Sequence, residues 1–117
     1  MIGQLEDLKK RIRRFADERD WDQFHTPKNL AMALIVEAAE LVEHFQWLTS
    51  DESQSLTAAK RAEAEAELAD ILIYLVRIAD KLDIDLYRAA IEKLQRNAEK
   101  YPAEKVRGKS RKYSEYP

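Results

Sequence analysis

Apolar residues recur every three or four positions along four stretches of the chain, with polar residues between them. These stretches are residues 2–18, 27–48, 58–82 and 86–101. In the first stretch, the apolar positions are Leu5, Leu8, Ile12 and Phe15. This spacing is typical of amphipathic helices that each pack on one side. The pattern therefore predicts an all-α protein, a bundle of four main helices.

Capping signals and proline mark the helix boundaries. Thr26, Thr57 and Asp85 precede the last three helices, where their side chains are suited to act as N-caps. Polar residues 49–55 predict a surface loop. The segment from Pro102 onward shows no helical period and carries several basic residues. We therefore expect one helical domain over residues 1–101 and a basic tail over residues 102–117.

Composition supports one helical domain and limits its partners. The 117 residues are 45% hydrophobic and include only 2 Gly and 3 Pro, which favours helices over a turn-rich β fold. No cysteine is present, so disulfides and thiolate metal sites are excluded. The net charge of −2 gives no reason to bind a nucleic acid polymer or an anionic membrane. With a charged N-terminus and no apolar run of bilayer length, we expect a cytoplasmic protein.

Two pairs of acidic residues suggest a metal site. Glu37 and Glu40 lie in the second predicted helix, and Glu67 and Asp70 in the third. A separation of three residues places both carboxylates of a pair on one helix face, beside an apolar stripe. Four carboxylates that converge between packed helices would bind a hard cation. Oxygen ligands without cysteine favour Mg²⁺, or Mn²⁺ as a substitute, over Zn²⁺ or Fe.

Other side chains on these faces suit a nucleotide. Glu40 and Trp47 are two helical turns apart, roughly 10 Å, which is about the reach from a metal-bound triphosphate to its base. An indole is a good surface for stacking a base. Lys93 and Asn97 share a face of the fourth helix, where a cation and an amide suit phosphate oxygens or a base edge.

Structural interpretations compete with each of these functional ones. Pairs of the type Glu-x-x-Glu are common on exposed helices, and a lone tryptophan such as Trp47 is more often core or interface. Trp21 and His25 could anchor the connection between the first two helices, and Tyr74 could be a core residue. The alternative function is a non-catalytic helical interaction module whose acidic faces bind a structural cation or none.

The third predicted helix is apolar over most of its circumference. Its apolar residues are Leu68, Ala69, Ile71, Leu72, Ile73, Leu75, Val76, Ile78 and Ala79. A helix of this kind must be buried on more than one side. One layer of helices from so short a chain cannot cover it, so the sequence predicts a homo-oligomer. Trp21, His25 or the tail of one subunit could then complete the site of another.

Five segments, taken in order, resemble the MazG-like all-α nucleoside triphosphate pyrophosphohydrolases. They are RDWDQFHTPKNL, EAAELVEHFQW, ELADILIYLV, KLQRNAEKYP and SRKY. The family motif joins Glu-x-x-Glu to Glu-x-x-Asp across a variable gap, which here is the 26 residues from Leu41 to Ala66. The segments are most similar to the dCTP pyrophosphatase branch, and they extend over nearly the whole chain.

This resemblance implies a function and a role for each candidate residue. The expected reaction is Mg²⁺-dependent hydrolysis of a (deoxy)nucleoside triphosphate, dCTP or a modified dCTP, to the monophosphate and pyrophosphate, which would clear unwanted nucleotides. The implied metal ligands and catalytic carboxylates are Glu37, Glu40, Glu67 and Asp70. The implied substrate-binding residues are Trp21, His25, Trp47, Tyr74, Lys93 and Asn97. The resemblance further implies a homotetramer.

Overall fold

The structure, a computed structural model, describes residues 3–110 and 113–115. Helices, turns and irregular connections make up this described part, which contains no strand, so the all-α prediction is confirmed. No helix among the described residues combines the length and the apolar content needed to cross a membrane. The chain divides into two compact units, Met1–Ile84 and Asp85–Pro117, and each is described by itself.

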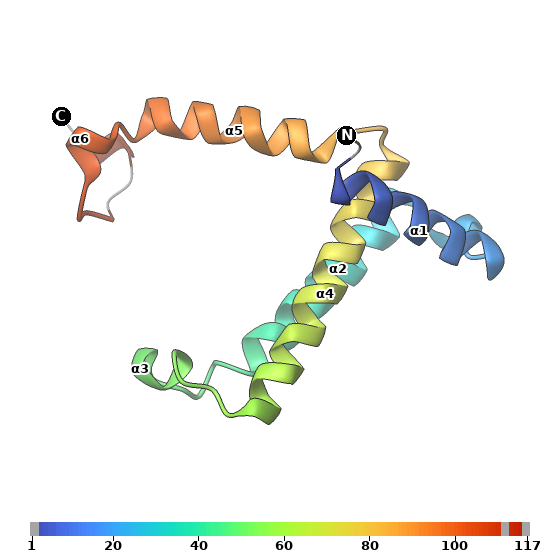
Figure 1. Cartoon of the computed structure of the whole chain (residues 1–117), viewed down its shortest axis with the longest axis horizontal. Coiled ribbons are helices and arrows are strands. Elements are labelled where there is room, and N and C mark those ends of the chain that lie inside the picture. The colour runs from blue at the N-terminus through green and yellow to red at the C-terminus, as the bar shows by residue number, and fades with distance from the viewer. Residues whose placement is uncertain (1–2, 111–112, 116–117) are drawn as a thin grey trace. The chain divides into compact units, whose positions relative to one another are not determined.

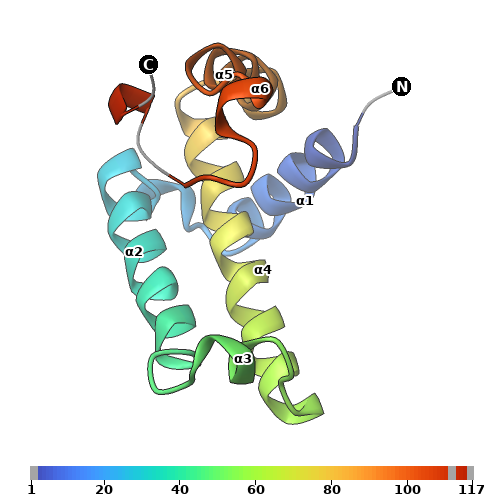
Figure 2. The same ribbon diagram turned by 90° about the vertical axis from the view of Figure 1, so that its left-hand side faces the viewer.

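The first unit is built on a pair of long helices. Its helices are α1 (Gln4–Glu18), the 3₁₀ helix η1 (Asp22–Phe24), α2 (Pro27–Glu43), α3 (Ser50–Ser53) and α4 (Ala58–Lys81). α2 and α4 lie side by side and run in opposite directions, joined through α3, while α1 packs across α4 (Figures 1 and 2). The acidic pairs were predicted on these two helices, one pair on each.

Small side chains let these helices approach closely. The buried apolar residues are Ala16 of α1, Leu30 of α2, and Ala64, Val76 and Ala79 of α4. Arg77 is the one buried charged residue of the described part of the chain, with 2% of its surface exposed. The core is modest, and it encloses a charge where α1 meets α4.

The predicted N-caps are all present. The Thr26 hydroxyl accepts a hydrogen bond from the Asn29 backbone N–H, and the Thr57 hydroxyl accepts one from the Lys60 N–H, both at 3.2 Å. Asp85 likewise accepts from the backbone N–H of Arg88 at 3.0 Å. Each cap satisfies one of the free N–H groups that a helix start leaves.

Two boundaries between α2 and α4 differ from the prediction. α2 ends at Glu43 rather than near Leu48, because the N–H groups of His44 and Phe45 bond three residues back and tighten the last turn. The predicted loop contains the short helix α3. Thr49 and Glu52 form a reciprocal capping box that starts it, at 2.8 and 3.1 Å.

α1 and α4 end in the same way. Asp20 and Asp83 each follow the C-cap residue with a φ of 54°, in the left-handed region. The next residue in each case, Trp21 or Ile84, donates its N–H to a carbonyl five residues back, at 2.9 and 2.8 Å. This is the Schellman arrangement, which usually has glycine at the left-handed position. In this protein an aspartate, not a glycine, occupies the left-handed position where the chain leaves each helix.

Much of the apolar surface of the pair is exposed. Leu68 is 55% exposed on α4 and Ile35 is 66% exposed on α2, and Leu72, Ile73 and Leu75 are also exposed. Val76, Arg77 and Ala79 in the second half of α4 are buried, but its other apolar faces are not covered by the single chain, as the sequence analysis expected. α1 and α2 cover only part of its circumference, and the apolar positions on the remaining faces lie in solvent.

The second unit begins with the long helix α5 (Leu86–Lys100). It is followed by α6 (Ala103–Val106) and a 3₁₀ turn, Tyr113–Glu115, in a segment whose sequence shows no helical period. Pro102 stops α5 and serves as the N-cap of α6. Residues 111, 112, 116 and 117 lie outside the described residues. The division into a catalytic domain over 1–101 and a tail over 102–117 stays a prediction.

Candidate active site

Three of the four predicted carboxylates come together between α2 and α4. Glu37 projects from α2, and Glu67 and Asp70 project from α4. One carboxylate oxygen from each lies within 4.8 Å of the other two. Glu37 and Glu67 are partly buried, whereas Asp70 is exposed. The three-residue spacing on α4 and the packing of α4 on α2 together create this carboxylate cluster, Glu37, Glu67 and Asp70.

No lysine or arginine of the described residues forms an ion pair with the carboxylate cluster. The Oε2 atoms of Glu37 and Glu67 are buried and have no hydrogen-bond partner among the described residues. The adjoining carboxyl of Glu67, then burial, then the charges of Glu40 and Asp70 raise the pKa of Glu37 to about 7. Crowded, partly desolvated carboxylates are costly unless a cation neutralises them. Oxygen donors of this kind fit a hard divalent metal, so the cluster is a possible acidic metal site.

Glu40 lies beside this cluster rather than within it. Its charge and its carboxyl contribute to the raised pKa of Glu37, one turn earlier on α2, so it is a near neighbour. Its oxygens do not join the set within 4.8 Å. The structure thus separates the four predicted carboxylates into a cluster of three and one adjacent acid.

Two further side chains border the carboxylate cluster. Burial, followed by the charges of Glu37 and Asp70, raises the pKa of Tyr74, which places its hydroxyl near the acids. His44 lies with Nδ1 3.4 Å from Glu63 and Nε2 3.7 Å from Glu67. The sequence placed His44 one turn after Glu40 but gave it no part in the site. Its contact with Glu67 crosses between helices, which spacing along one helix cannot reveal.

An aromatic group lies near the N-terminal end of α2, where α1 ends, and not at the end of α2 that carries His44. The rings of Phe15 and Trp21 meet edge to face at 5.7 Å, and those of Trp21 and His25 at 6.4 Å. Trp21 is 44% exposed, so much of the indole remains accessible to solvent. His25 is partly buried, and its Nδ1 accepts a hydrogen bond from Nε of Arg77 at 3.1 Å.

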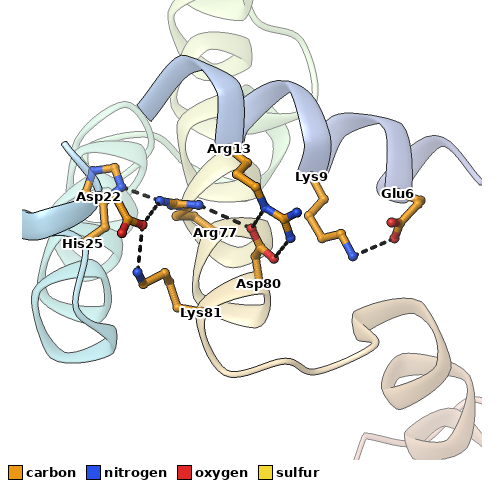
Figure 3. Close-up of polar contacts among 8 residues, drawn as sticks. All are labelled: Glu6, Lys9, Arg13, Asp22, His25, Arg77, Asp80 and Lys81. Atoms are coloured by element: carbon orange, nitrogen blue, oxygen red, sulfur yellow. Dashed lines mark hydrogen bonds and ion pairs between the residues drawn. The ribbon is translucent and has the colours of Figure 1, made fainter. Parts of the chain in front are cut away.

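Arg77 is the centre of an ion-pair network that the sequence analysis missed (Figure 3). Its guanidinium donates to Asp22 at 2.7 Å and to Asp80 at 3.3 Å. Asp80 also accepts from Arg13 at 3.0 Å, and Asp22 accepts from Lys81 at 2.8 Å. One signal was present in the sequence. An arginine within the apolar run around Val76 and Ile78 must be paired if that run is buried.

Trp47 is not close to Trp21 and His25 in the single chain. It follows the C-terminal end of α2, whereas Trp21 and His25 precede its N-terminal end. Trp47 is 87% exposed and lies in the turn after Glu43, so the predicted helical stripe from Glu40 to Trp47 is interrupted. The structure therefore divides the predicted base-binding residues between two ends of α2.

The remaining predicted residues belong to the second unit. Lys93 and Asn97 lie one turn apart on α5, where Lys93 is exposed and Asn97 partly buried. Their shared helix face agrees with the spacing in the sequence. Their contact with a nucleotide stays a prediction.

Comparison with known proteins identifies the family. A family model described as the MazG-like family matches residues 32–116. The chain is 46% identical to dCTP pyrophosphatase 1 of Homo sapiens over 115 residues, which cover 97% of this chain and 68% of that protein. It is 44% identical to dCTP pyrophosphatase 1 of Rattus norvegicus over the same shares of both chains. The crystal structure of a pyrophosphatase from Archaeoglobus fulgidus matches with a TM-score of 0.81 and 41% identity, over 87% of this chain and 95% of that one. The resemblance seen in the sequence is thus confirmed, and the chain belongs to the MazG-like family.

Proposed function

We propose that this chain is a nucleoside triphosphate pyrophosphohydrolase that hydrolyses dCTP, or a dCTP modified on its base, and so removes unwanted nucleotides. The carboxylate cluster is the observation that supports the proposal most directly. The names of the human and rat relatives support the reaction and the cytosine base. The pyrophosphatase from Archaeoglobus fulgidus supports the same class of hydrolase.

In the proposed reaction, water attacks the α-phosphorus of the triphosphate. A bond forms between the water oxygen and the α-phosphorus, the bond from the α-phosphorus to the bridging oxygen breaks, and pyrophosphate leaves. Glu37, Glu67 and Asp70 would hold Mg²⁺. When bound, Mg²⁺ neutralises triphosphate charge and makes its bound water more acidic. We assign the role of accepting the proton of the attacking water to Glu40, because it lies beside the proposed ligands.

Side chains away from the acids would hold the nucleoside. Trp21 offers an exposed indole for stacking, and His25 lies beside it. Tyr74 lies between this end of α4 and the carboxylates, one turn after Asp70 and one turn before Arg77. We assign Lys93 and Asn97 to contacts with the nucleotide on the strength of the family resemblance.

A panel of deoxynucleoside triphosphates tests this function. We expect pyrophosphate release in the presence of Mg²⁺, fastest with dCTP or a 5-modified dCTP, and none with EDTA. Release of inorganic phosphate alone would contradict cleavage at the α-phosphorus. No product from any nucleotide would favour the alternative, a helical interaction module without catalysis.

We further propose that the active unit is an oligomer, a tetramer made of two dimers. The exposed apolar side chains of α2 and α4 support this, because monomers rarely leave so many large aliphatic residues in water. In this assembly we propose that Trp21 and His25 of one subunit complete the nucleotide site of another, together with Trp47. Light scattering should give a mass well above 13.7 kDa, and specific activity should fall on dilution below the dissociation constant. A fully active monomer would refute the shared site.

A further inference from the structure

The hydrogen bond between Arg77 and His25 defines the protonation of the imidazole. Arg77 is almost completely buried, and its Nε lies 3.1 Å from Nδ1 of His25. A guanidinium has only donors and keeps its charge at every accessible pH. Nδ1 must therefore accept, which requires its lone pair. A neutral imidazole with a free Nδ1 carries its proton on Nε2.

The guanidinium cannot easily turn away from this arrangement. Its two terminal nitrogens donate to Asp22 at 2.7 Å and to Asp80 at 3.3 Å. Asp80 is itself held by Arg13 of α1, and Asp22 by Lys81 of α4. Figure 3 shows Arg77 surrounded by these partners, with the second ring nitrogen of His25 on the far side of the ring. The network thus fixes both the position of Nε and the tautomer of His25.

The Nε2–H group of His25 is available to a ligand. Nε2 has no hydrogen-bond partner within residues 3–110 and 113–115, and His25 is only partly buried. The exposed indole of Trp21 lies beside it, with the ring centres 6.4 Å apart. Arg77 follows Asp70 by seven residues on α4, two turns or roughly 10 Å along the axis. A donor beside an exposed indole, held by an arginine two turns from the acids, suits the base of a metal-bound triphosphate.

We propose that Arg77 is a positioning residue that keeps His25 neutral with its proton on Nε2, so that His25 donates a hydrogen bond to an acceptor atom of the nucleotide base. This inference rests on the proposed function and deepens it. Cytosine presents two acceptors on one edge, O2 and N3, whereas N3 of uracil and thymine carries a proton. An Nε2–H donor that reaches N3 would therefore favour cytosine over those two bases.

The electrostatic surroundings of His25 agree with a neutral ring. Burial, followed by the positive charge of Arg77, lowers the pKa of His25, and Lys81 acts in the same direction. Asp22 alone acts in the opposite direction, and its carboxylate is already shared by Arg77 and Lys81. Protonation of Nδ1 would place two N–H donors against each other.

Nitrogen NMR of the ligand-free protein tests the tautomer without any assay of activity. The chain has only two histidines, so a long-range ¹H–¹⁵N spectrum shows two imidazoles, and His44→Asn assigns them. We expect a protonated Nε2 and an unprotonated Nδ1 for His25 at pH 7. A protonated Nδ1, a mixture of tautomers or a doubly protonated ring would overturn the proposal.

Two arginine variants separate positioning from stability. In Arg77→Gln we expect His25 to lose its single tautomer and its pKa to rise. Arg13→Gln, the matched control, removes a bond to Asp80 but leaves Nδ1 of His25 with its donor. It should lower stability and leave the His25 signals unchanged. Equal changes in both variants would mean that Arg77 acts only through folding. If Arg77→Gln does not fold, the wild-type spectrum still decides the tautomer.

Variants of His25 test the donated bond. His25→Leu should raise KM for dCTP by about tenfold with little change in kcat, the effect of one lost hydrogen bond in binding. Gln reaches about as far as Nε2 and carries donors, so His25→Gln should recover part of this loss. Equal KM values in both variants would refute the donor role. Titration with dCMP, followed at the Nε2–H signal, reports the same contact in a protein that hydrolyses nothing, so failure of the proposed function remains distinguishable.

Discussion

α4 carries two groups of charged residues with opposite characters, about two turns apart. The carboxylate cluster near its middle consists of acids alone, and two of its buried oxygens have no partner among the described residues. The network around Arg77 near its end pairs every buried charge with at least one opposite charge. The first is a possible metal site, whereas the buried charges of the second are already paired. A charge imbalance, rather than the number of charges, marks the candidate active site.

Removal of one carboxylate from the cluster should have the largest effect of the substitutions considered. It should lower turnover but raise the free energy of unfolding. We expect Glu67→Gln to reduce turnover by roughly 10²–10³-fold, as for the loss of one preorganised group that stabilises developing charge. In EDTA at pH 8, its free energy of unfolding should rise, because Glu67 is the main cause of the raised pKa of Glu37. The measurements are pyrophosphate release and urea unfolding.

Glu65→Gln is the matched control for that variant. Glu65 is an exposed acid on the same helix, two residues before Glu67. The same substitution there should leave turnover and stability close to wild type. Equal losses in both variants would show that the charge of α4 as a whole matters, not the cluster.

Breaking the paired network should instead lower stability. The Asp80 side chain is 9% exposed and accepts from Arg13 and Arg77. We expect Asp80→Asn to lower the free energy of unfolding at pH 7 by about 2–3 kcal/mol, because charged hydrogen bonds are lost in a buried setting. Urea unfolding measures this difference.

The same pair predicts the acid sensitivity of the fold. The hydrogen bond from Arg13 is the main cause that lowers the pKa of Asp80, with further help from Arg77. An acid with a lowered pKa in the folded state stabilises the protein above its ordinary pKa, about 3.9, and loses this contribution as the pH falls through the folded value. The wild type should therefore lose stability below about pH 4 more steeply than Asp80→Asn. Parallel curves would contradict this role.

Mg²⁺ should stabilise the protein through the unbalanced cluster. At ten times its dissociation constant, a single bound ion adds about 1.4 kcal/mol to the free energy of unfolding. We expect this gain in wild type and in Asp80→Asn, but not in Glu67→Gln. An equal gain in all three proteins would place the ion elsewhere.

Loss of an outer member of the network should have the smallest effect. Lys81 donates to Asp22, whose carboxylate keeps its bond to buried Arg77 when Lys81 is removed. Exposed ion pairs contribute little. Lys81→Gln should therefore shift the urea midpoint far less than Asp80→Asn does. A comparable loss would mean that Lys81 belongs to the buried part of the network.

Local signals explain which features of the fold the sequence could predict. The N-caps at Thr26, Thr57 and Asp85 depend on bonds three residues long, and all three are present. The end of α2 was placed too late because no glycine or proline marks Glu43. The capping box of Thr49 and Glu52 was local too, but the polar segment was interpreted as a loop without testing that pair.

In the candidate site too, local features were predictable from the sequence and long-range contacts were not. Glu67 and Asp70 share a helix face, so their proximity was predictable from spacing. The contacts of Arg77 join positions 52 and 55 residues apart, to His25 and Asp22, and no periodicity encodes them. Such pairings depend on how α1 and η1 pack against α4. The sequence therefore indicated the acids well and missed the network that holds the imidazole.

The aspartates that follow α1 and α4 are positions at which a substitution could raise the stability of the protein. Asp83 places a negative charge at the negative end of the α4 dipole and adopts a left-handed conformation that asparagine tolerates better. Asp83→Asn should therefore raise the melting temperature, corresponding to about 0.5 kcal/mol, without touching either charged group on α4. At Asp20 the side chain also accepts a hydrogen bond from Gln23, which offsets the unfavourable charge and conformation at the end of α1. Thermal unfolding of Asp83→Asn and of Asp20→Asn would show how much each left-handed aspartate lowers the melting temperature.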